Sequence, residues 1–365
     1  MSTTSYGVND ALAVKLWSKK LAHEVSKATP IAPLIGKSSN SIIQLKEETN
    51  KSKGDKITCG LRMQLTGDGV SEGQVLEGNE ESLTTYSDSL LINEVNHAVR
   101  VRNNQTIDAQ RVPFSLREEA KDALVDWYAD RMSMMFFLQS CGYNASSVTF
   151  EGNSYNLTGV HYGHNAPTAP SSGRVLRAGS QASDQALTSS DIFTLDLIDK
   201  AVEMAKVANP KVRPVRVNGS NHYVMYLHPY QVTDMRTNTS TGQWLDIQKN
   251  AERRGGDNPI FDGSLGVYNN VILRESEHVM PGVDTTASPA EETDVRRAVL
   301  LGAQSCVAAF GMDRTPTKYK MVEELFDYQR EFGTSCQTVL GMKKTVFNSE
   351  DFGSVVVSTY AAAHT

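Results

Sequence analysis

The amino-acid sequence predicts an α+β chain with four parts: an N-terminal arm, an extended β-hairpin loop, a domain built on one long helix, and an α/β domain. Three observations support this prediction. Apolar residues alternate with period two over 57–65, recur at helical spacing over 116–138, and form mixed helix and strand patterns after residue 190. At 365 residues the chain is also too long for one core to organise.

The first predicted element is a short amphipathic helix on the arm. Its apolar stripe consists of Val14, Trp17, Leu21 and Val25, and the helix ends before Pro30 and Pro33. A Ser-rich stretch follows, so the stripe has nothing local to pack against. We expect the helix to dock elsewhere on this chain or on a neighbour, with Trp17 as its anchor.

Two extended runs then predict a projecting hairpin. The first alternates from Ile57 to Leu65, and the second runs from Leu83 to Arg102 with one apolar face formed by Leu91, Val95, Val99 and Val101. The loop between them is rich in glycine and in acidic residues, namely Asp68, Glu72, Glu77, Glu80 and Glu81. Because an isolated hairpin is marginal in water, we expect this one to rest on something outside its own domain.

A long helix follows the hairpin. Ser115 and Glu118 have the spacing of a capping box, and apolar residues continue at helical spacing to about Cys141. Such a helix has about 25 residues and a length of about 37 Å. Trp127 and Phe136 are interpreted as packing residues on it. The next stretch, 142–190, is rich in Gly, Ser, Asn and Pro and is interpreted as loops or an insertion.

The remaining chain reads as alternating helices and strands. The predicted helices cover Ile192 to Ala205, a segment starting at His228-Pro229, and Ala303 to Ala309. The predicted strands cover Tyr223 to Leu227, Val267 to Leu273, Arg297 to Leu301, and several segments after Pro316.

Composition excludes several classes of protein. The net charge is −6 and lysines and arginines occur at most in pairs, which argues against non-specific nucleic-acid binding. The longest apolar run, Met132 to Leu138, is far too short for a membrane-spanning helix, and the N-terminus lacks a signal-peptide pattern. Four widely spaced cysteines predict reduced thiols in a protein made in a cytoplasm.

Candidate chemical motifs are all incomplete. Gly36-Lys37-Ser38 lacks the first glycine of a phosphate-binding loop, and His23-Glu24 lacks the second histidine of a zinc-protease helix. His161 and His164 could chelate a metal from a loop, but no Cys, Asp or Glu nearby completes the ligand set. We therefore expect no enzyme activity, no cofactor and no metal.

Several ordered segments resemble a known family. They span almost the whole chain and include Trp17-Ser-Lys-Lys-Leu21, Leu76-Glu-Gly-Asn-Glu-Glu-Ser-Leu83, Asn96-His-Ala-Val-Arg100 with Gln110-Arg111, Leu227-His-Pro-Tyr-Gln-Val-Thr-Asp-Met-Arg236, Phe261-Asp-Gly-Ser-Leu-Gly-Val-Tyr268, Leu301-Gly-Ala-Gln304 and Gly341-Met-Lys-Lys-Thr-Val-Phe-Asn348 with Asp351-Phe-Gly353. The set is similar to the major capsid proteins of tailed double-stranded DNA bacteriophages, specifically the N-four-type podovirus family. That family has the Hong Kong phage-type capsid fold.

The resemblance implies a domain plan. It comprises an N-terminal arm (1–41), the extended hairpin loop (42–102), a peripheral domain with the spine helix (about 115–141) and a loop insertion (103–189), an axial α/β domain (190–315), and closing strands of the peripheral domain (316–365). It implies that copies form hexamers and pentamers of an icosahedral shell around double-stranded DNA, which is bound without sequence-specific contacts. Residues 244–258 are expected near the capsomer axis.

On this resemblance the site residues lie at subunit interfaces. The candidates are Trp17, Asp68, Glu72, Glu77, Glu80, Glu81, Arg100, Arg102, Arg111, Arg253 and Arg254. The expected partners are other copies of the chain, a separate scaffolding protein, a portal protein and a decoration protein, with no membrane contact. The chain reaches its hairpin by about residue 50, so we expect no cleaved N-terminal scaffolding segment, and we expect no covalent crosslink. It is expected in the virion after synthesis in the host bacterial cytoplasm.

Two alternatives remain open. An encapsulin-like shell would share the fold but enclose a protein cargo. A metal-dependent enzyme using the His161/His164 loop would bind metal and form a monomer or small oligomer.

Overall fold

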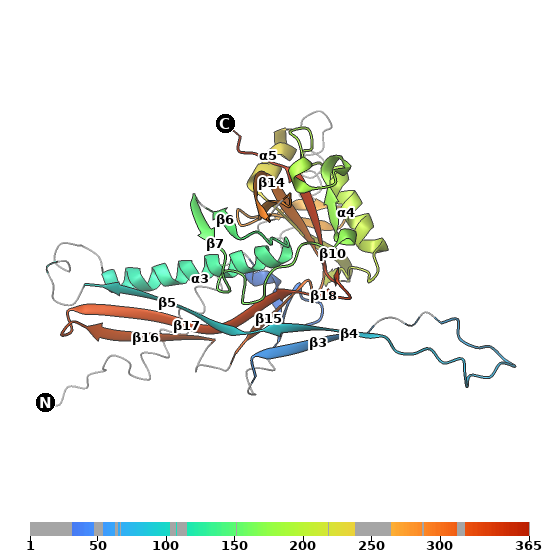
Figure 1. Ribbon diagram of the computed structural model, residues 1–365, viewed down its shortest axis with the longest axis horizontal. Coiled ribbons are helices and arrows are strands. Elements are labelled where there is room, and N and C mark those ends of the chain that lie inside the picture. Colours follow the sequence, from blue (N-terminus) through green and yellow to red (C-terminus); the bar gives the residue numbers. More distant parts are fainter. Residues whose placement is uncertain are drawn as a thin grey trace.

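A computed structural model describes residues 31–46, 54–62, 65, 67–102, 107, 115–150, 152–217, 219–237, 264–286, 288–311 and 318–364. The molecule is elongated, with a long ribbon of strands and one helix below a more compact lobe (Figure 1). A narrow hairpin extends from the ribbon at one end. The α+β class predicted from the sequence is confirmed.

The ribbon is built on a six-stranded sheet. Its order is β1-β2-β15-β17-β16, and β5 pairs with β17 as well. The strands are β1 (Ile35–Gly36), β2 (Ile43–Lys46), β5 (Asn93–Val101), β15 (Cys306–Phe310), β16 (Tyr319–Phe326) and β17 (Glu331–Lys344). The 14-residue β17 joins the two halves of this sheet. Its first part pairs with β5 and β16, and its last part pairs with β15.

The compact lobe contains an eight-stranded sheet. Its order is β11-β12-β10-β14-β20-β8, with β13 on β14 and β9 on β10. The strands are β8 (Val175–Arg177), β9 (Val215–Val217), β10 (Ser220–Leu227), β11 (Ser264–Tyr268), β12 (Val271–Glu275), β13 (Pro281–Asp284), β14 (Ala290–Leu301) and β20 (Ser354–Tyr360). Helices α4 (Leu195–Val207) and α5 (Pro229–Thr237) belong to this lobe.

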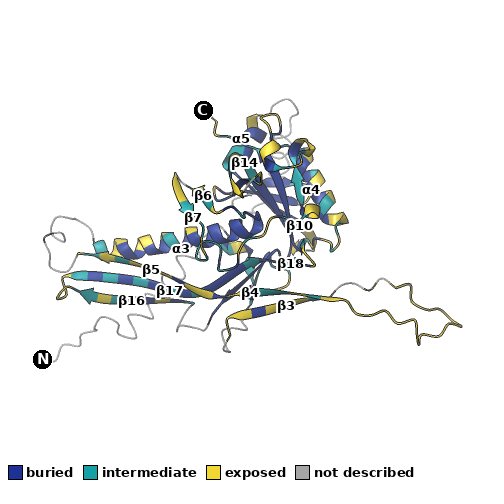
Figure 2. Cartoon of the chain, in the orientation of Figure 1, coloured by how far each residue is buried: buried dark blue, intermediate teal, exposed yellow. Residues whose placement is uncertain are grey.

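The predicted spine helix is confirmed as α3 (Leu116–Ser140), which has 25 residues and lies along β5 and β17 (Figure 1). The capping box is not formed, since the Ser115 side chain caps no backbone group. Instead the Ser115 carbonyl accepts hydrogen bonds from the N–H groups of Glu118 and Glu119, at 3.0 and 3.1 Å. Every residue from Arg131 to Ser140 is buried, so the helix end lies inside the protein (Figure 2).

Tyr128 fastens α3 to the sheet. Its hydroxyl lies 2.9 Å from the Val95 carbonyl and 2.7 Å from the Cys336 carbonyl, on the paired strands β5 and β17. The side chain is almost fully buried. Trp127, the residue before it on α3, stacks on His97 of β5 with ring centroids 4.4 Å apart. The expectation that Trp127 and Phe136 are packing residues is therefore confirmed.

The hairpin exists, but its second strand is interrupted. Strand β3 (Lys56–Arg62) pairs antiparallel with β4 (Thr85–Leu91), whereas β5 begins at Asn93 and pairs with β17. Leu90 and Ile92 are buried, and Leu91 is 43% exposed. The prediction that Leu91 shares the apolar face of Val95 was therefore wrong. The strand changes its pairing partner at Ile92, and this change shifts the alternation of buried and exposed side chains. Leu65 is also exposed, since β3 ends before it.

Residues 142–190 are not only loops. They include the small β6–β7 hairpin (Ser147–Phe150 and Asn153–Asn156), strand β8, and three short 3-10 helices at 172–174, 178–180 and 184–186. Tyr143, Arg174 and Asp184 are almost completely buried. This segment thus packs as an internal part of the fold, so the interpretation as loops alone was wrong, whereas the interpretation as an insertion stays a prediction. The composition of a segment does not predict which of its side chains are buried when that burial depends on partners far away in the sequence.

Two further predictions in the α/β region were wrong. Residues 267–273 form the hairpin of β11 and β12, which turns at Asn269 and Asn270 with φ of 42° and 60°. Residues 303–309 contain strand β15 and no helix, because β15 inserts between β2 and β17. A short apolar run does not distinguish a buried strand from a helix. The strand at 223–227 and the helices at 195–207 and 229–237 agree with prediction.

Some predictions lie outside the described residues. These are the arm helix with Trp17, Arg111, and the segment 244–258 with Arg253 and Arg254. The domain boundaries remain predictions. Among the described residues, no helix has both the length and the apolar character that crossing a membrane requires.

Candidate subunit interface

The acidic loop lies at one extreme of the molecule, beyond the paired part of β3 and β4 (Figures 1 and 2). Its five acidic side chains are all exposed, namely Asp68, Glu72, Glu77, Glu80 and Glu81. Residues 65–84 contain no lysine or arginine. The loop therefore presents concentrated negative charge without a cation of its own.

Two of these carboxylates also brace the loop. Glu81 Oε2 accepts a hydrogen bond from the Gly67 N–H at 2.6 Å, across the width of the loop. Glu80 Oε2 accepts one from the Gly78 N–H at 2.7 Å. Glu80 and Glu81 consequently support the loop conformation in addition to carrying charge, whereas no such bond is seen for Glu72 or Glu77 within the described residues.

Sequence reasoning missed the apolar side chains of the same loop. Leu65, Val75, Leu76 and Leu83 are each between 57% and 68% exposed. Val70 is 36% exposed. Single exposed apolar residues are normal, but five on one loop are typical of a surface that a partner covers. Their position in or beside an acidic, glycine-rich stretch was visible in the sequence. Leu65 and Leu83 were interpreted as ends of the strands, and Val75 and Leu76 were given no role at an interface.

The base of the hairpin is firmly held. Lys343 of β17 forms an ion pair with Asp88 of β4 and donates a second hydrogen bond to the Ser89 carbonyl at 3.1 Å. The other oxygen of Asp88 accepts the Val346 N–H at 3.1 Å. A small separate core formed by Ile57, Leu90, Ile92, Val307 and Ala309 lies beneath. The hairpin is thus anchored at its base and has no such core at its tip.

Asn165 stabilises the interruption between β4 and β5. Its Oδ1 accepts the Leu91 N–H and its Nδ2 donates to the Leu91 carbonyl, both at 2.9 Å. Nδ2 also lies 2.8 Å from the Gly163 carbonyl and 3.3 Å from the Met342 carbonyl. The side-chain amide of Asn165 thus takes the place of a neighbouring strand. It satisfies both the N–H and the carbonyl of Leu91 at the point where the pairing changes.

The basic candidates lie elsewhere on the chain. Arg100 and Arg102 are about half exposed at the far end of β5, and both pair with Glu331, at 2.5 and 2.8 Å. The Arg100 guanidinium also lies 4.4 Å from the centroid of the Phe326 ring. The hydrogen bond from Arg102, with the charge of Arg100, lowers the pKa of Glu331. A single chain therefore does not bring these arginines to the acidic loop (Figure 1).

A buried ion pair connects the spine helix to the compact lobe. Asp184 receives hydrogen bonds from Arg297 at 2.7 Å and Arg177 at 2.8 Å. Arg297 also donates to the carbonyls of Cys141 and Gly142, where α3 ends, at 3.3 and 2.9 Å. Burial alone would raise the pKa of Asp184, but the two arginines outweigh it and lower that pKa. A cation at a helix C-terminus is also favoured by the helix dipole.

A second buried ion pair lies at the same junction. Lys344 Nζ is 2.8 Å from Asp351 Oδ1 and 3.2 Å from the Ala169 carbonyl. Arg174 donates to the Asp351 carbonyl at 2.9 Å. Each buried charge thus has several partners, which is the condition under which burial of an ion pair is tolerated.

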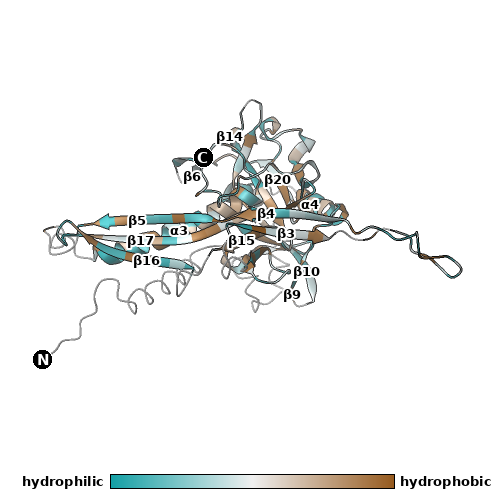
Figure 3. Cartoon of the chain, turned by 60° about the horizontal axis from the view of Figure 1, so that its bottom comes forward, coloured by the Kyte–Doolittle hydropathy of each residue, from teal (hydrophilic) through white to brown (hydrophobic). Residues whose placement is uncertain are grey.

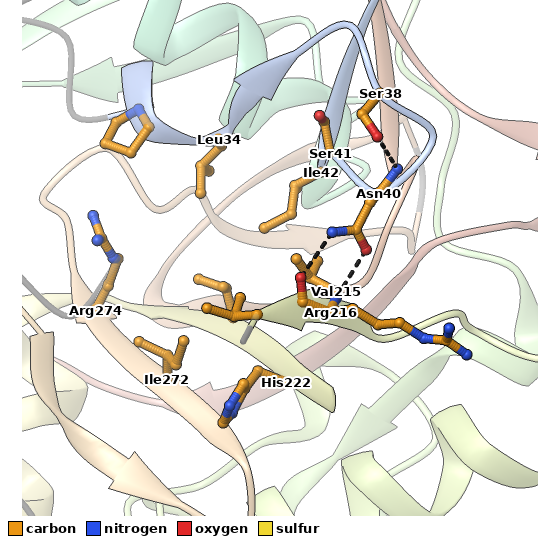
Figure 4. Close-up of a pocket in the computed structure, with 13 residues that line it drawn as sticks. Leu34, Ser38, Asn40, Ser41, Ile42, Val215, Arg216, His222, Ile272 and Arg274 are labelled. Atoms are coloured by element: carbon orange, nitrogen blue, oxygen red, sulfur yellow. Dashed lines mark hydrogen bonds between the residues drawn. The ribbon is translucent and has the colours of Figure 1, made fainter. Parts of the chain in front are cut away.

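The segment that follows the arm is tied to both sheets. Asn40 exchanges two hydrogen bonds with the backbone of Arg216 in β9, at 2.8 and 2.9 Å (Figure 4). Strand β2 pairs with β15 in the other sheet. Between the segment and the compact lobe lies a cavity of 210 Å³ lined mainly by apolar side chains such as Leu34 and Ile272 (Figure 4). Residues 31–46 therefore lie at the junction of the two sheets.

The histidine loop does not form a metal site in the described residues. His161 Nδ1 accepts the Thr158 N–H at 3.1 Å, and burial lowers the pKa values of both His161 and His164. No group of three or more His, Cys, Asp or Glu side chains in the described part of the chain could hold a metal ion. These two histidines alone supply too few ligands for a structural or catalytic site.

Comparisons with known proteins show the family and the fold. A family model described as "Phage capsid protein" matches residues 5–363. The chain is 28% identical over 374 residues to the "Major capsid protein" of Pseudomonas phage KPP25, covering 95% of this chain and 94% of that protein. Among solved structures, the "Capsid of Ralstonia phage GP4" superposes with a TM-score of 0.79 at 28% identity over 100% of both chains. The "Cyanophage Pam1 capsid asymmetric unit" gives 0.68 at 21% identity, over 93% and 94%.

Proposed function

Because this chain belongs to the phage capsid protein family and is a major capsid protein of a phage head, we propose that its copies assemble into hexamers and pentamers of an icosahedral shell around double-stranded DNA. The observation that carries the proposal is the match of the family and of the fold over essentially the whole chain.

The exposed hairpin supports assembly as the use of this fold. Its loop combines five carboxylates, five exposed apolar side chains and no cation, which is an unfavourable surface for an isolated subunit. Covering it with a neighbour removes apolar area from water and pairs the charge. Arg100 and Arg102, and Arg111, Arg253 and Arg254 outside the described residues, are our candidates for basic partners on neighbouring copies.

We infer finer assignments from the segments quoted above. The chain is grouped with the N-four-type podovirus capsid proteins. Its partners during assembly are a separate scaffolding protein, a portal protein and a decoration protein. Synthesis and assembly take place in the host bacterial cytoplasm. The net charge of −6 suits a container that encloses DNA without gripping it.

The test is particle size. The chain is expressed with and without its phage's scaffolding protein, and the products are measured by electron microscopy and light scattering. Closed particles tens of nanometres across support the proposal. A monomer or small oligomer under both conditions would contradict it. Particles that copurify with a protein cargo, in the phage-infected cell as well as alone, would instead favour the encapsulin-like alternative.

A further inference from the structure

Tyr328 lies at the tip of the ribbon, in the turn between β16 and β17, and is 99% exposed. The Arg330 N–H donates to the Asp327 carbonyl at 3.0 Å, so Tyr328 and Gln329 occupy the two central positions of the turn. Their φ angles are 51° and 70°, and that of Asp327 is 48°. Two-residue turns with positive φ at both central positions strongly prefer Asn and Gly.

This turn is therefore costly in two ways. Three consecutive residues other than glycine adopt the left-handed region, which crowds the Cβ atom of each. In addition, a large aromatic ring remains in water. Strained backbone of this kind is concentrated at functional sites, where a side chain must be held in one position. Nothing within the described part of the same chain covers the ring.

A cavity that suits an aromatic ring lies on the same ribbon. It measures 240 Å³, and its floor is formed by Ala98, Val322 and Ser335, which are neighbours across β5, β17 and β16. In the next row the Phe326 ring packs over Gly333, where an added Cβ would come within 2.6 Å of it, and this ring forms one wall of the cavity. The small side chains of Ala98 and Ser335 leave the hollow beside that wall.

The cavity is on the face of the ribbon that α3 does not cover. Phe332 faces α3, because the guanidinium of Arg117 lies 4.9 Å from its ring. Side chains alternate along a strand, so Gly333 and Ser335 face the opposite side. Figure 3 turns that side of β5, β17 and β16 towards the viewer. Within the described part of the chain, the hollow is open to another molecule in the same way as the tyrosine.

The charges beside the ring and beside the cavity are complementary. Asp327 and Arg330 flank Tyr328, pair with each other at 3.6 Å, and are still 38% and 60% exposed. Arg100 and Glu324 line the cavity, and the Arg100 side chain is 54% exposed although it pairs with Glu331. An incoming turn could therefore set Asp327 beside Arg100 and Arg330 beside Glu324, while the tyrosine hydroxyl meets the polar groups of the cavity wall.

We propose that Tyr328 of one copy inserts into the cavity above Ala98, Val322 and Ser335 of a second copy. This inference rests on the proposed shell assembly and names one of its contacts. The tyrosine and the cavity are separate surfaces of one copy, so each copy can insert its tyrosine into one neighbour and receive the tyrosine of another. Such a head-to-tail contact forms a closed ring where the rotation between successive copies closes. The strained turn fixes the ring before binding, which reduces the entropy lost on association.

The first experiment is site-specific photocrosslinking in assembled particles. The photoreactive amino acid p-benzoylphenylalanine replaces Tyr328, and in a control chain it replaces Val207, an apolar residue of similar exposure on α4. Irradiation of the Tyr328 variant is expected to give covalent dimers whose linked peptide contains residues 322–326 or 333–335. Particles without dimers, or dimers linked only elsewhere, would overturn the proposal.

The second experiment separates the fold from the contact. In Tyr328→Gly one of the three strained positions of the turn is relieved, so the subunit should be at least as stable to heat as the unmodified chain. Its critical concentration for assembly should rise about tenfold or more, as for other aromatic hot spots, and Tyr328→Phe should remain close to the unmodified chain. Unchanged assembly of Tyr328→Gly would refute the contact. Failure of the unmodified chain to assemble would refute the proposed function instead.

Discussion

The carboxylate of Asp184 and the guanidinium of Arg297 form an ion pair of 2.7 Å in which both side chains are at least 96% buried. Arg297 belongs to β14 of the compact lobe, and its remaining donors hold the carbonyls at the end of α3. Asp184 comes from the segment that looked like an insertion. The pair therefore connects three parts of the chain that are distant in sequence.

We predict that Asp184→Asn destabilises the subunit by about 3–5 kcal/mol at neutral pH, because Arg297 and Arg177 lose the carboxylate that compensates their buried charge. Thermal unfolding measures the change. Asp196→Asn, which removes an exposed partner of Lys200, is the matched control and should change stability by less than about 1 kcal/mol. Equal effects of the two variants would contradict a special role for Asp184.

The same pair predicts a pH dependence. The pKa of Asp184 is lower in the folded subunit than in the unfolded chain, so its contribution to stability is present above the unfolded value of about 4 and is lost as the pH falls through the folded value. The difference in melting temperature between the unmodified chain and Asp184→Asn should be largest above pH 4 and should shrink below it. A constant difference down to pH 2 would be inconsistent with this linkage.

For the acidic loop, the most direct test is Glu72→Lys combined with Glu77→Lys. Substitution of Glu80 and Glu81 would also break hydrogen bonds inside the loop, whereas no such bond is seen for Glu72 or Glu77 in the described residues. We expect an unchanged melting temperature of the subunit and no closed shells by electron microscopy. Asp196→Lys with Glu203→Lys changes the net charge equally and should still assemble. Normal shells from the loop variant would show that the loop is not an essential contact.

Asn165→Asp tests the interruption between β4 and β5. The new carboxylate would place negative charge against the carbonyls of Leu91, Gly163 and Met342, to which the amide now donates. We expect a loss of about 1–3 kcal/mol or more at neutral pH, since buried carbonyls lose their donors. Hydrogen exchange at Leu91 and Ile92 should accelerate more than exchange in the compact lobe. Uniform acceleration would mean that Asn165 supports the whole fold and not this point.

Tyr128→Phe measures the attachment of the spine helix. The change removes a hydroxyl that bonds to the carbonyls of Val95 and Cys336 and leaves the ring in place. We expect a loss of about 1 kcal/mol, visible as a melting temperature lower by a few degrees. Tyr86→Phe, on the partly exposed β4 strand, serves as the control and should have almost no effect. No change in Tyr128→Phe would indicate that the hydroxyl contributes nothing beyond packing.

The sequence determined those features that depend on local periodicity. The bounds of α3, the start of β3, the pair β3–β4 and the exposed acidic loop follow from apolar spacing and composition within short windows. Even so, Leu91 was assigned to the wrong face, because alternation predicts side-chain direction only while a strand keeps one partner. The partner changes at Ile92, and the amide that permits the change comes from Asn165, 74 residues away.

Only the tertiary structure decided how these elements come together. The sequence of β15 was interpreted as a helix. It forms a strand because its backbone pairs with β2 on one side and with β17 on the other. The polar stretch 142–190 is internal because two of its buried charges have distant partners. Asp184 pairs with Arg297, and Arg174 donates to the carbonyl of Asp351, each more than 100 residues away in the sequence. The Tyr328 turn and the cavity of the ribbon depend on backbone angles and on three strands in register. Local sequence sets the period of an element, but burial, register and surface shape arise from contacts between distant segments.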